Sequence, residues 1–196
     1  MEENVKTSLT FKMLRLLGFN YSVVDYGQVS LWGLFKQVWL NFYHKLLMNM
    51  MDWAILEPIN PRKLRPILLR AMGAKVGKNV YIGAKVFVDM SHADLIEIGD
   101  HTHITNRTVL LCHKHDLSNY CVGDDYAELP YIYGKIVIGK GCSTGTDSII
   151  MPGVTIGDGA VIGAGSLVTK DIPAWTVAVG RPAKVIREIP KRINQE

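Results

Sequence analysis

Two histidines and an aspartate follow one another closely in the run Cys112-His113-Lys114-His115-Asp116. Imidazole suits general base catalysis because its pKa lies near neutral pH, and a carboxylate beside it can hold it in one orientation. Such a set can take the proton from an alcohol while the alcohol oxygen attacks an electrophilic centre. His113 is our preferred base and His115 the alternative, since two positions apart on an extended strand they share a face. Asp116, or another acid of this segment, is the candidate to orient the imidazole.

The elements that position these residues follow from a six-residue period, which is neither the 3.6 of a helix nor the 2 of an ordinary strand. The anchors of the period are Ile138, Thr144, Ile150, Ile156, Ile162, Val168 and Ala174. Small or medium residues come four positions after most anchors: Cys142, Ser148, Val154, Ala160 and Ser166. This period indicates a parallel β-helix, in which three short strands form a triangular coil and each anchor stacks on the next coil.

The same period occurs earlier in the chain with two interruptions. The earlier anchors are Val76, Ile82, Val88, Ile98, Ile104 and Leu110. The register slips between Val88 and Ile98, and it breaks again between Leu110 and Ile136. Each interruption predicts a loop that leaves the coils. The second loop, residues 111–135, carries both candidate histidines, and a long excursion from a compact repeat is often functional.

Three segments are expected: an N-terminal helical arm (1–70), a β-helix domain (71–187) with a protruding loop at about 113–135, and a C-terminal tail (188–196). Helices are expected in the arm at residues 7–18, 28–57 and 62–72. All of the net charge of +4 lies in the arm, which has nine Lys or Arg and five Asp or Glu. Two interpretations of the arm stay open. It packs on the β-helix or a partner subunit, or its Trp, Phe, Leu and Lys residues place it on a membrane surface.

The cysteines indicate a reducing compartment, because Cys112, Cys121 and Cys142 are odd in number and lack CxxC spacing. The sequence contains no run of 18 uncharged apolar residues, so it predicts no membrane-spanning helix. The first residues, with Glu2 and Glu3, do not resemble a secretory signal. We therefore expect a cytoplasmic protein, with the inner face of the membrane as a further possible place for the arm. No nucleic-acid-binding motif is present.

The C-terminal repeats resemble the bacterial hexapeptide-repeat acetyltransferases. The resemblance covers about residues 70–190 and is carried by the run from Ile150 to Pro173 and by the ending Val179-Gly180-Arg181-Pro182-Ala183-Lys184-Val185-Ile186-Arg187. It is strongest to galactoside and maltose acetyltransferases and to the acetyltransferases of polysaccharide and lipopolysaccharide synthesis. The resemblance implies a left-handed β-helix, a homotrimer with active sites between subunits, and acetyl-CoA as donor. It also implies a sugar or glycan hydroxyl as acceptor and no required metal.

The resemblance also implies site residues. The family's catalytic histidine falls at the position of His113. The positions that match its coenzyme A contacts are Gly145, Thr146, Ala164, Ser166, Thr169 and Lys170, with Arg181, Lys184 and Arg187 suited to the phosphates. Ser166 is equally explained as a small inward residue of the repeat. The acceptor is expected at Asp89 and, less strongly, Asn106 and Arg107, and at Asp124 and Tyr126 near the loop tip.

Other functions remain open at this point. The same base serves N-acetylation or a serine-type acetyltransferase. A zinc carbonic anhydrase of similar fold needs three histidine ligands, and the two-histidine spacing with four residues between them is missing. A non-catalytic scaffold is the third alternative. His92, His101 and His103 are expected to lie on the surface, or to contribute to substrate binding across the trimer interface.

Overall fold

The computed structural model describes residues 7–19 and 23–191. The chain divides into two compact units. One comprises Met1–Tyr43 and Lys114–Ile132, and the other comprises His44–His113 and Tyr133–Glu196. Within the described residues, no helix combines the length and the apolar character needed to cross a bilayer.

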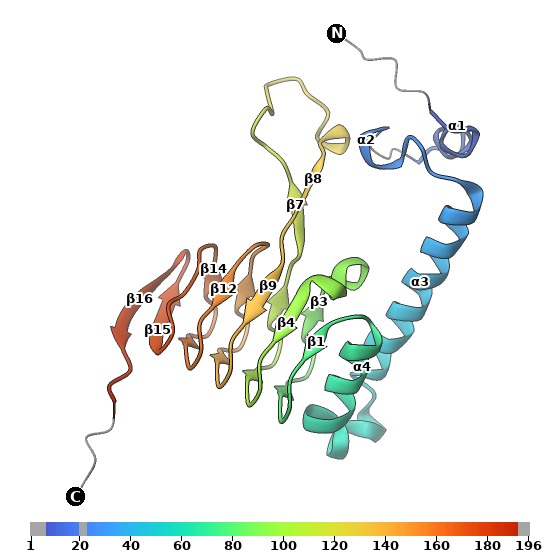
Figure 1. The fold of residues 1–196 in the computed structure, drawn as a ribbon. Helices are drawn as coiled ribbons and strands as arrows, with labels where there is room; N and C mark the ends of the chain where they lie inside the picture. Colours follow the sequence, from blue (N-terminus) through green and yellow to red (C-terminus); the bar gives the residue numbers. More distant parts are fainter. Residues whose placement is uncertain (1–6, 20–22, 192–196) are drawn as a thin grey trace, which may run out of the picture. The chain divides into compact units, whose positions relative to one another are not determined.

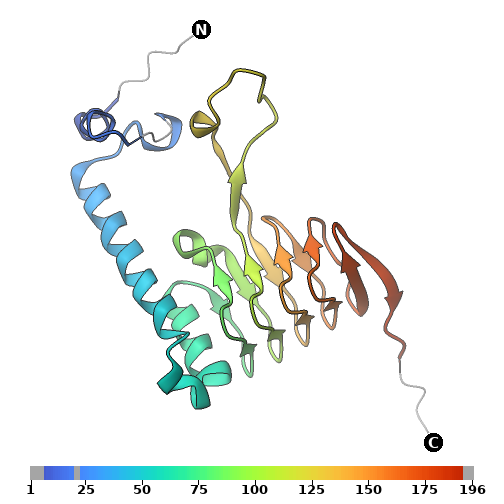
Figure 2. The same ribbon diagram turned by 180° about the vertical axis from the view of Figure 1, so that it is seen from behind.

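The larger unit contains a left-handed parallel β-helix with three faces (Figures 1 and 2). The six-residue period predicts the stacked coils, and the family resemblance implies their hand. Face A contains β1 (Lys75–Val76), β4 (Ile96–Ile98), β9 (Ile136–Ile138) and β12 (Thr155–Ile156). Face B contains β2 (Tyr81–Ile82), β5 (His103–Ile104), β10 (Ser143–Thr144), β13 (Val161–Ile162), β15 (Thr176–Gly180) and the antiparallel β16 (Ala183–Glu188). Face C contains β3 (Phe87–Val88), β6 (Val109–Leu110), β11 (Ile149–Ile150) and β14 (Leu167–Val168).

The predicted anchors pair with one another in register and form the core. On face C, Val88 pairs with Leu110, Leu110 with Ile150, and Ile150 with Val168. All four are fully buried. The residues four places after the anchors, from Cys142 to Ser166, are buried as well. The period therefore corresponds to stacked inward columns.

One anchor is wrong. Ala174 is exposed, and Ile172 is buried and forms a parallel bridge with Ile156. The inward position thus comes four residues after Val168 rather than six. Isoleucine supplies the aliphatic volume that the end of the core needs, and alanine does not.

Both predicted loops leave the coils at the edge where face C leads into face A. The first contains η3 (Met90–Leu95). The second starts as the hairpin of β7 (His113–His115) and β8 (Tyr131–Tyr133) and includes the short 3₁₀ turn η4 (Tyr126–Glu128).

The N-terminal helices are shorter than predicted. They are α1 (Leu9–Leu16), α2 (Val23–Tyr26), α3 (Leu31–Met50), the 3₁₀ turn η1 (Ala54–Ile59), the π turn η2 (Asn60–Leu64) and α4 (Arg65–Ala71). Leu68 and Leu69 of α4 are buried in the same cluster as Ile82 and Val88, so α4 closes the first coil. The buried Arg65 donates to the carbonyls of Met51 and Ile82 at 2.8 and 3.1 Å. This side chain joins the end of α3 to the coils.

Gly99 tests the close approach of the coils. A Cβ at this position would lie 2.6 Å from the carbonyl carbon of Gly139 and 2.7 Å from the nitrogen of Lys140, both backbone atoms. We expect Gly99→Ala to lower the free energy of unfolding by about 2–3 kcal/mol, because the next coil must shift. Gly141→Ala is the control: its Cβ meets nothing within 4 Å, but φ is +65°, so it costs about 1 kcal/mol. Urea unfolding measures both, and equal losses would contradict the steric explanation.

The cysteines test the packing of the core. Burial, followed by the charges of Asp89 and Asp94, raises the pKa of the Cys112 thiol to about 12, and burial also raises the pKa of Cys142. A raised pKa keeps these thiols protonated and unreactive at pH 8, whereas Cys121 is exposed. We expect one fast-reacting thiol per native chain in a DTNB titration and none in Cys121→Ser. A second fast thiol in the native protein would contradict the burial of the other two.

Candidate active site

A buried carboxylate forms the centre of the candidate site. Asp89 directly follows β3 and is 4% exposed. Its carboxylate accepts a hydrogen bond from the backbone N–H of Cys112 at 3.3 Å and contacts Nδ1 of His113. Nδ1 of His92 lies 3.5 Å from its other oxygen. Nitrogen atoms from both loops therefore surround one charge that is shielded from water.

Coil stacking explains why residues 24 positions apart meet here. Val88 pairs with Leu110, and the N–H of Asp89 donates to the carbonyl of Leu110 at 3.1 Å. The two loops thus start one coil apart on the same edge. The second strand of the hairpin returns beside the first, with Gly134 donating to the carbonyl of Cys112 at 2.9 Å. The position of His113 therefore depends on backbone pairing on both sides.

The contact with Asp89 determines the tautomer of His113. A carboxylate only accepts hydrogen bonds, so Nδ1 carries the proton and the lone pair lies on Nε2. The His113 side chain is 37% exposed, so solvent reaches the ring. An imidazole held by a buried carboxylate can accept a proton at Nε2, and the carboxylate stabilises the imidazolium that forms.

Two aromatic rings beside His113 were not assigned to the site by the sequence. The His92 ring centroid lies 4.6 Å from that of Tyr133 and 5.5 Å from that of His113. The ring of Tyr133 lies 6.3 Å from that of His113. Nδ1 of His44 lies 2.6 Å from the carbonyl oxygen of Met90, which holds η3 in place. The signal for His92 was present: it comes three residues after Asp89, inside the first break of the repeat.

The alternative base, His115, has a weaker partner. Its Nδ1 lies 3.1 Å from the carbonyl oxygen of Leu129, and its ring packs 4.2 and 4.4 Å from the rings of Tyr131 and Tyr126. Asp116 does not orient His113, contrary to the sequence-based expectation. Its carboxylate accepts the N–H and O–H of Ser118 at 2.9 and 2.6 Å, and these bonds lower the pKa of Asp116.

The residues expected to bind coenzyme A lie along two edges of the β-helix and on its last strand. Gly145, Thr146 and Ala164 lie between strands of face B and face C, whereas Thr169 and Lys170 follow β14 on the edge of His113. Arg181 donates to the carbonyl of Gly165 at 2.7 Å and extends the first row. Lys184 and Arg187 are exposed on β16.

Among the residues expected to bind the cofactor, Ser166 turns its side chain into the coil. It is fully buried, and its hydroxyl accepts the N–H of Gly180 at 3.1 Å. The repeat requires a small inward residue at this position, and that packing role accounts for the serine.

The residues expected to bind the acceptor have other contacts. The Asp89 carboxylate is occupied by His113 and Cys112. Asn106 accepts the N–H of Ala84 at 2.9 Å and so joins two coils, while Arg107 forms a two-pronged ion pair with Asp147. Asp124 accepts the N–H of Cys121 at 2.7 Å. Tyr126 is half exposed and packs edge-on against His115.

The remaining histidines are on the surface. His101 and His103 are exposed, and the His103 ring stacks on Tyr81 at 5.4 Å. This agrees with the first of the two expectations for them.

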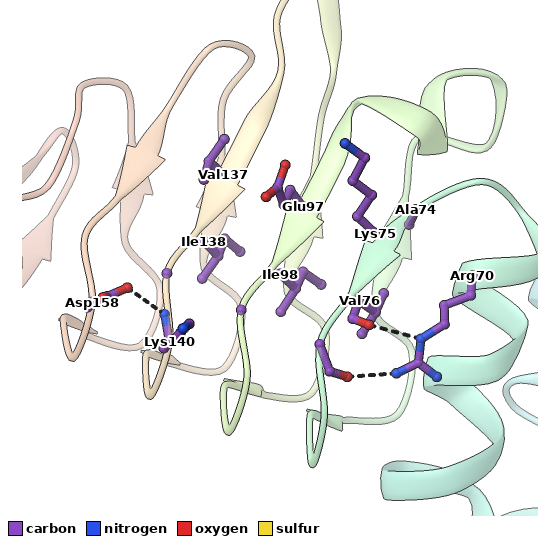
Figure 3. Close-up of a pocket in the computed structure, with 13 residues that line it drawn as sticks. Arg70, Ala74, Lys75, Val76, Glu97, Ile98, Val137, Ile138, Lys140 and Asp158 are labelled. Carbon is purple, nitrogen blue, oxygen red and sulfur yellow. Dashed lines mark hydrogen bonds between the residues drawn. The ribbon is translucent and has the colours of Figure 1, made fainter.

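A groove on face A of about 630 Å³ contains none of the predicted site residues (Figure 3). Its polar groups hold the coils. Arg70 donates to the carbonyls of Val76 and Gly77 at 2.9 and 2.6 Å, and Asp158 accepts the N–H of Lys140 at 2.7 Å. The groove is therefore explained by the stacking of the coil corners.

The alternative of a three-histidine zinc site is not supported. In residues 7–19 and 23–191, the one group whose ligand atoms converge, to within 4.8 Å of one another, is Asp89, His92 and His113. It contains two imidazoles and the carboxylate that already contacts His113. A carbonic anhydrase of the type considered needs three imidazoles.

Comparison with known proteins agrees with this architecture. Residues 135–170 match the family described as bacterial transferase hexapeptide (six repeats). WcaF of Escherichia coli K12, named for acetyl transfer in colanic acid biosynthesis, is 38% identical over 153 residues, which cover 69% of this chain and 84% of WcaF.

Two solved structures are similar. Galactoside acetyltransferase in complex with coenzyme A has a TM-score of 0.61 and 30% identity, with 79% of this chain and 82% of that chain covered. The N-acyltransferase AntD of Bacillus cereus was solved as its S84A mutant with dTDP-4-amino-4,6-dideoxyglucose and coenzyme A. It has a TM-score of 0.51 and 26% identity. The similar region covers 60% of this chain and 64% of AntD, so less than two thirds of AntD is covered. The extent of the match to WcaF and the stacked six-residue coils show that the chain belongs to the hexapeptide-repeat acetyltransferases, enzymes that use acetyl-CoA as acyl donor.

Proposed function

We propose that the protein transfers an acetyl group from acetyl-CoA to a hydroxyl of a sugar or glycan precursor, with His113 as general base. The buried contact between the Asp89 carboxylate and Nδ1 of His113 is the observation that carries this proposal. It gives one histidine of the pair a carboxylate partner, whereas His115 has a carbonyl.

The chemistry needs no further protein nucleophile. Nε2 of His113 takes the proton of the acceptor hydroxyl while its oxygen attacks the thioester carbonyl. The tetrahedral intermediate then collapses, the C–S bond breaks, and the imidazolium returns the proton to the leaving thiolate. Asp89 acts through His113, because it fixes the tautomer and stabilises the positive charge.

The names of the relatives support a sugar acceptor. A galactoside offers only hydroxyl groups to an acyl donor, and WcaF is named for the synthesis of a polysaccharide. AntD supports a second candidate, N-acetylation of an amino sugar, since the same base serves an amine. We favour O-acetylation because galactoside O-acetyltransferase of Escherichia coli K12, at 38% identity over 144 residues, is more similar in sequence than AntD at 26%. A serine-type acetyltransferase has no support from these relatives.

The two edges of the β-helix favour a homotrimer. His113, Thr169 and Lys170 lie on one edge, and Gly145 and Arg181 lie in the row on another. In a threefold assembly, one edge of each subunit can face a different edge of its neighbour, which would complete a site from two chains. Coenzyme A would lie in this cleft, with its phosphates near β16.

The division of labour along the chain is part of the proposal. Residues 71–187 would carry catalysis, and the loop at about 113–135 would shape the acceptor pocket. The part of residues 1–70 that lies outside the core would attach the enzyme to another surface. We place the protein in the cytoplasm, where acetyl-CoA and reduced thiols occur, at the inner face of the membrane.

Substitutions at His113, Asp89 and His115 test the assignment of His113 as the general base. We expect His113→Ala to lower kcat by about 10²–10⁴-fold, because proton removal loses its base. Asp89→Asn should lower kcat by about 10²-fold with the KM for acetyl-CoA unchanged. His115→Ala is the matched control and should stay within a few-fold of the native enzyme.

Release of the coenzyme A thiol with a panel of sugars and amino sugars measures these rates, and sedimentation checks that the variants keep their assembly. The reverse order of the two histidine variants would transfer the role of base to His115. Turnover with amino sugars alone would replace O-acetylation by N-acetylation.

Removal of positive charge on β16 tests the phosphate site. We expect the double variant Lys184→Ala/Arg187→Ala to raise the Kd of acetyl-CoA about tenfold, because charge-assisted hydrogen bonds to phosphate are lost. The Kd of acetyl-pantetheine, which has no phosphate, should not change. The double variant Lys75→Ala/Lys78→Ala, away from β16, is the control. Calorimetry measures the Kd of acetyl-CoA and of acetyl-pantetheine for the native protein and for both double variants. An equal effect on both ligands would contradict a phosphate role.

A further inference from the structure

Helix α3 exposes a continuous row of large apolar side chains. The α3 stripe consists of Trp32, Phe35, Trp39, Phe42 and Leu46. These side chains are 42–74% exposed. The intervals alternate between three and four residues, so all five lie on one side of the helix. Trp32 stacks with Phe35 at 5.9 Å between ring centroids, and Trp39 lies 6.0 Å from Phe42. The stripe therefore presents two aromatic pairs in one row.

The other side of α3 serves the protein itself. Leu47 is buried in the core, and the ring of His44 contacts the carbonyl of Met90. Leu34 and Leu40 are half-buried. Internal packing is thus seen at the C-terminal end of this other side. It leaves the stripe unexplained.

The charges beside the stripe indicate whether a second copy of α3 or a membrane surface covers it. The helix has no Asp or Glu, and Lys36 and Lys45 lie on opposite margins of the stripe, one on each side. A second α3 packed on this seam would bring lysines together with no acid to pair with them. A surface of phosphates offers the complementary charge, and Trp side chains favour the boundary between headgroups and acyl chains.

We propose that α3 lies in the plane of an anionic membrane surface, with the stripe at the acyl boundary and Lys36 and Lys45 among the lipid phosphates. The lysines on both margins limit the depth of insertion, because their ammonium groups stay in the headgroup layer. Exposed Leu9, Met13 and Leu16 give α1 a similar row. The inference rests on the membrane location proposed above and is independent of the base in catalysis.

The experiment is flotation of the full-length protein with vesicles of phosphatidylcholine alone and of phosphatidylcholine with phosphatidylglycerol. We expect the native protein to float with the anionic vesicles and to be released by 0.5 M salt. Trp32→Ser/Trp39→Ser and Lys36→Glu/Lys45→Glu should each lower the bound fraction at least tenfold. Trp175→Ser, which removes an indole 60% exposed on the β-helix, and Lys75→Glu/Lys78→Glu are the matched controls and should bind like the native protein.

Acetyl transfer to a soluble acceptor separates this inference from the proposed reaction, since the tryptophan variant should keep its turnover. Equal binding to neutral vesicles, or equal loss in the controls, would overturn the inference. So would a stripe variant that changes the oligomeric state by sedimentation, because the stripe would then be a subunit interface.

Discussion

The close stacking of successive coils is the constraint on which the rest of this structure depends. Each coil contributes inward side chains on every face, and the backbones at the corners approach so closely that Gly99 has no room for a Cβ. Hydrogen bonds between coils and the buried columns then hold neighbouring strands in one register. A β-helix of this kind has little freedom to slide, since a shift would move the anchors out of the core.

That register creates the candidate site. Both loops leave the same edge one coil apart, so the residue after β3 and the residues after β6 become neighbours. The buried Asp89 would be costly without donors, and the N–H groups of Cys112 and His113 satisfy it. A stabilising requirement of the fold thereby produces an oriented imidazole. The repeat supplies a rigid frame, and the candidate site lies where the repeat is interrupted.

The N-terminal arm has one part that is buried against the coils and one part that is exposed. Its end joins the coils through the buried Arg65 and through Leu47, which share the interior with the first coil. The stripe of α3 has the opposite property, because its rings face outward and contact one another in two pairs. A helix with two apolar faces cannot be interpreted from hydrophobicity alone, since composition does not say which face the protein itself covers.

The sequence by itself determined the β-helix and its two interruptions, and it identified the segment with His113 as the candidate site. These features repeat locally, so a period of six is visible without knowledge of distant contacts. Only the tertiary structure decided that Asp89 rather than Asp116 contacts His113, that His92 and Tyr133 lie beside it, and that Ile172 replaces Ala174 in the core. These outcomes depend on where the chain resumes its register after each loop. Loop length does not determine that point, because packing and hydrogen bonds between coils select it.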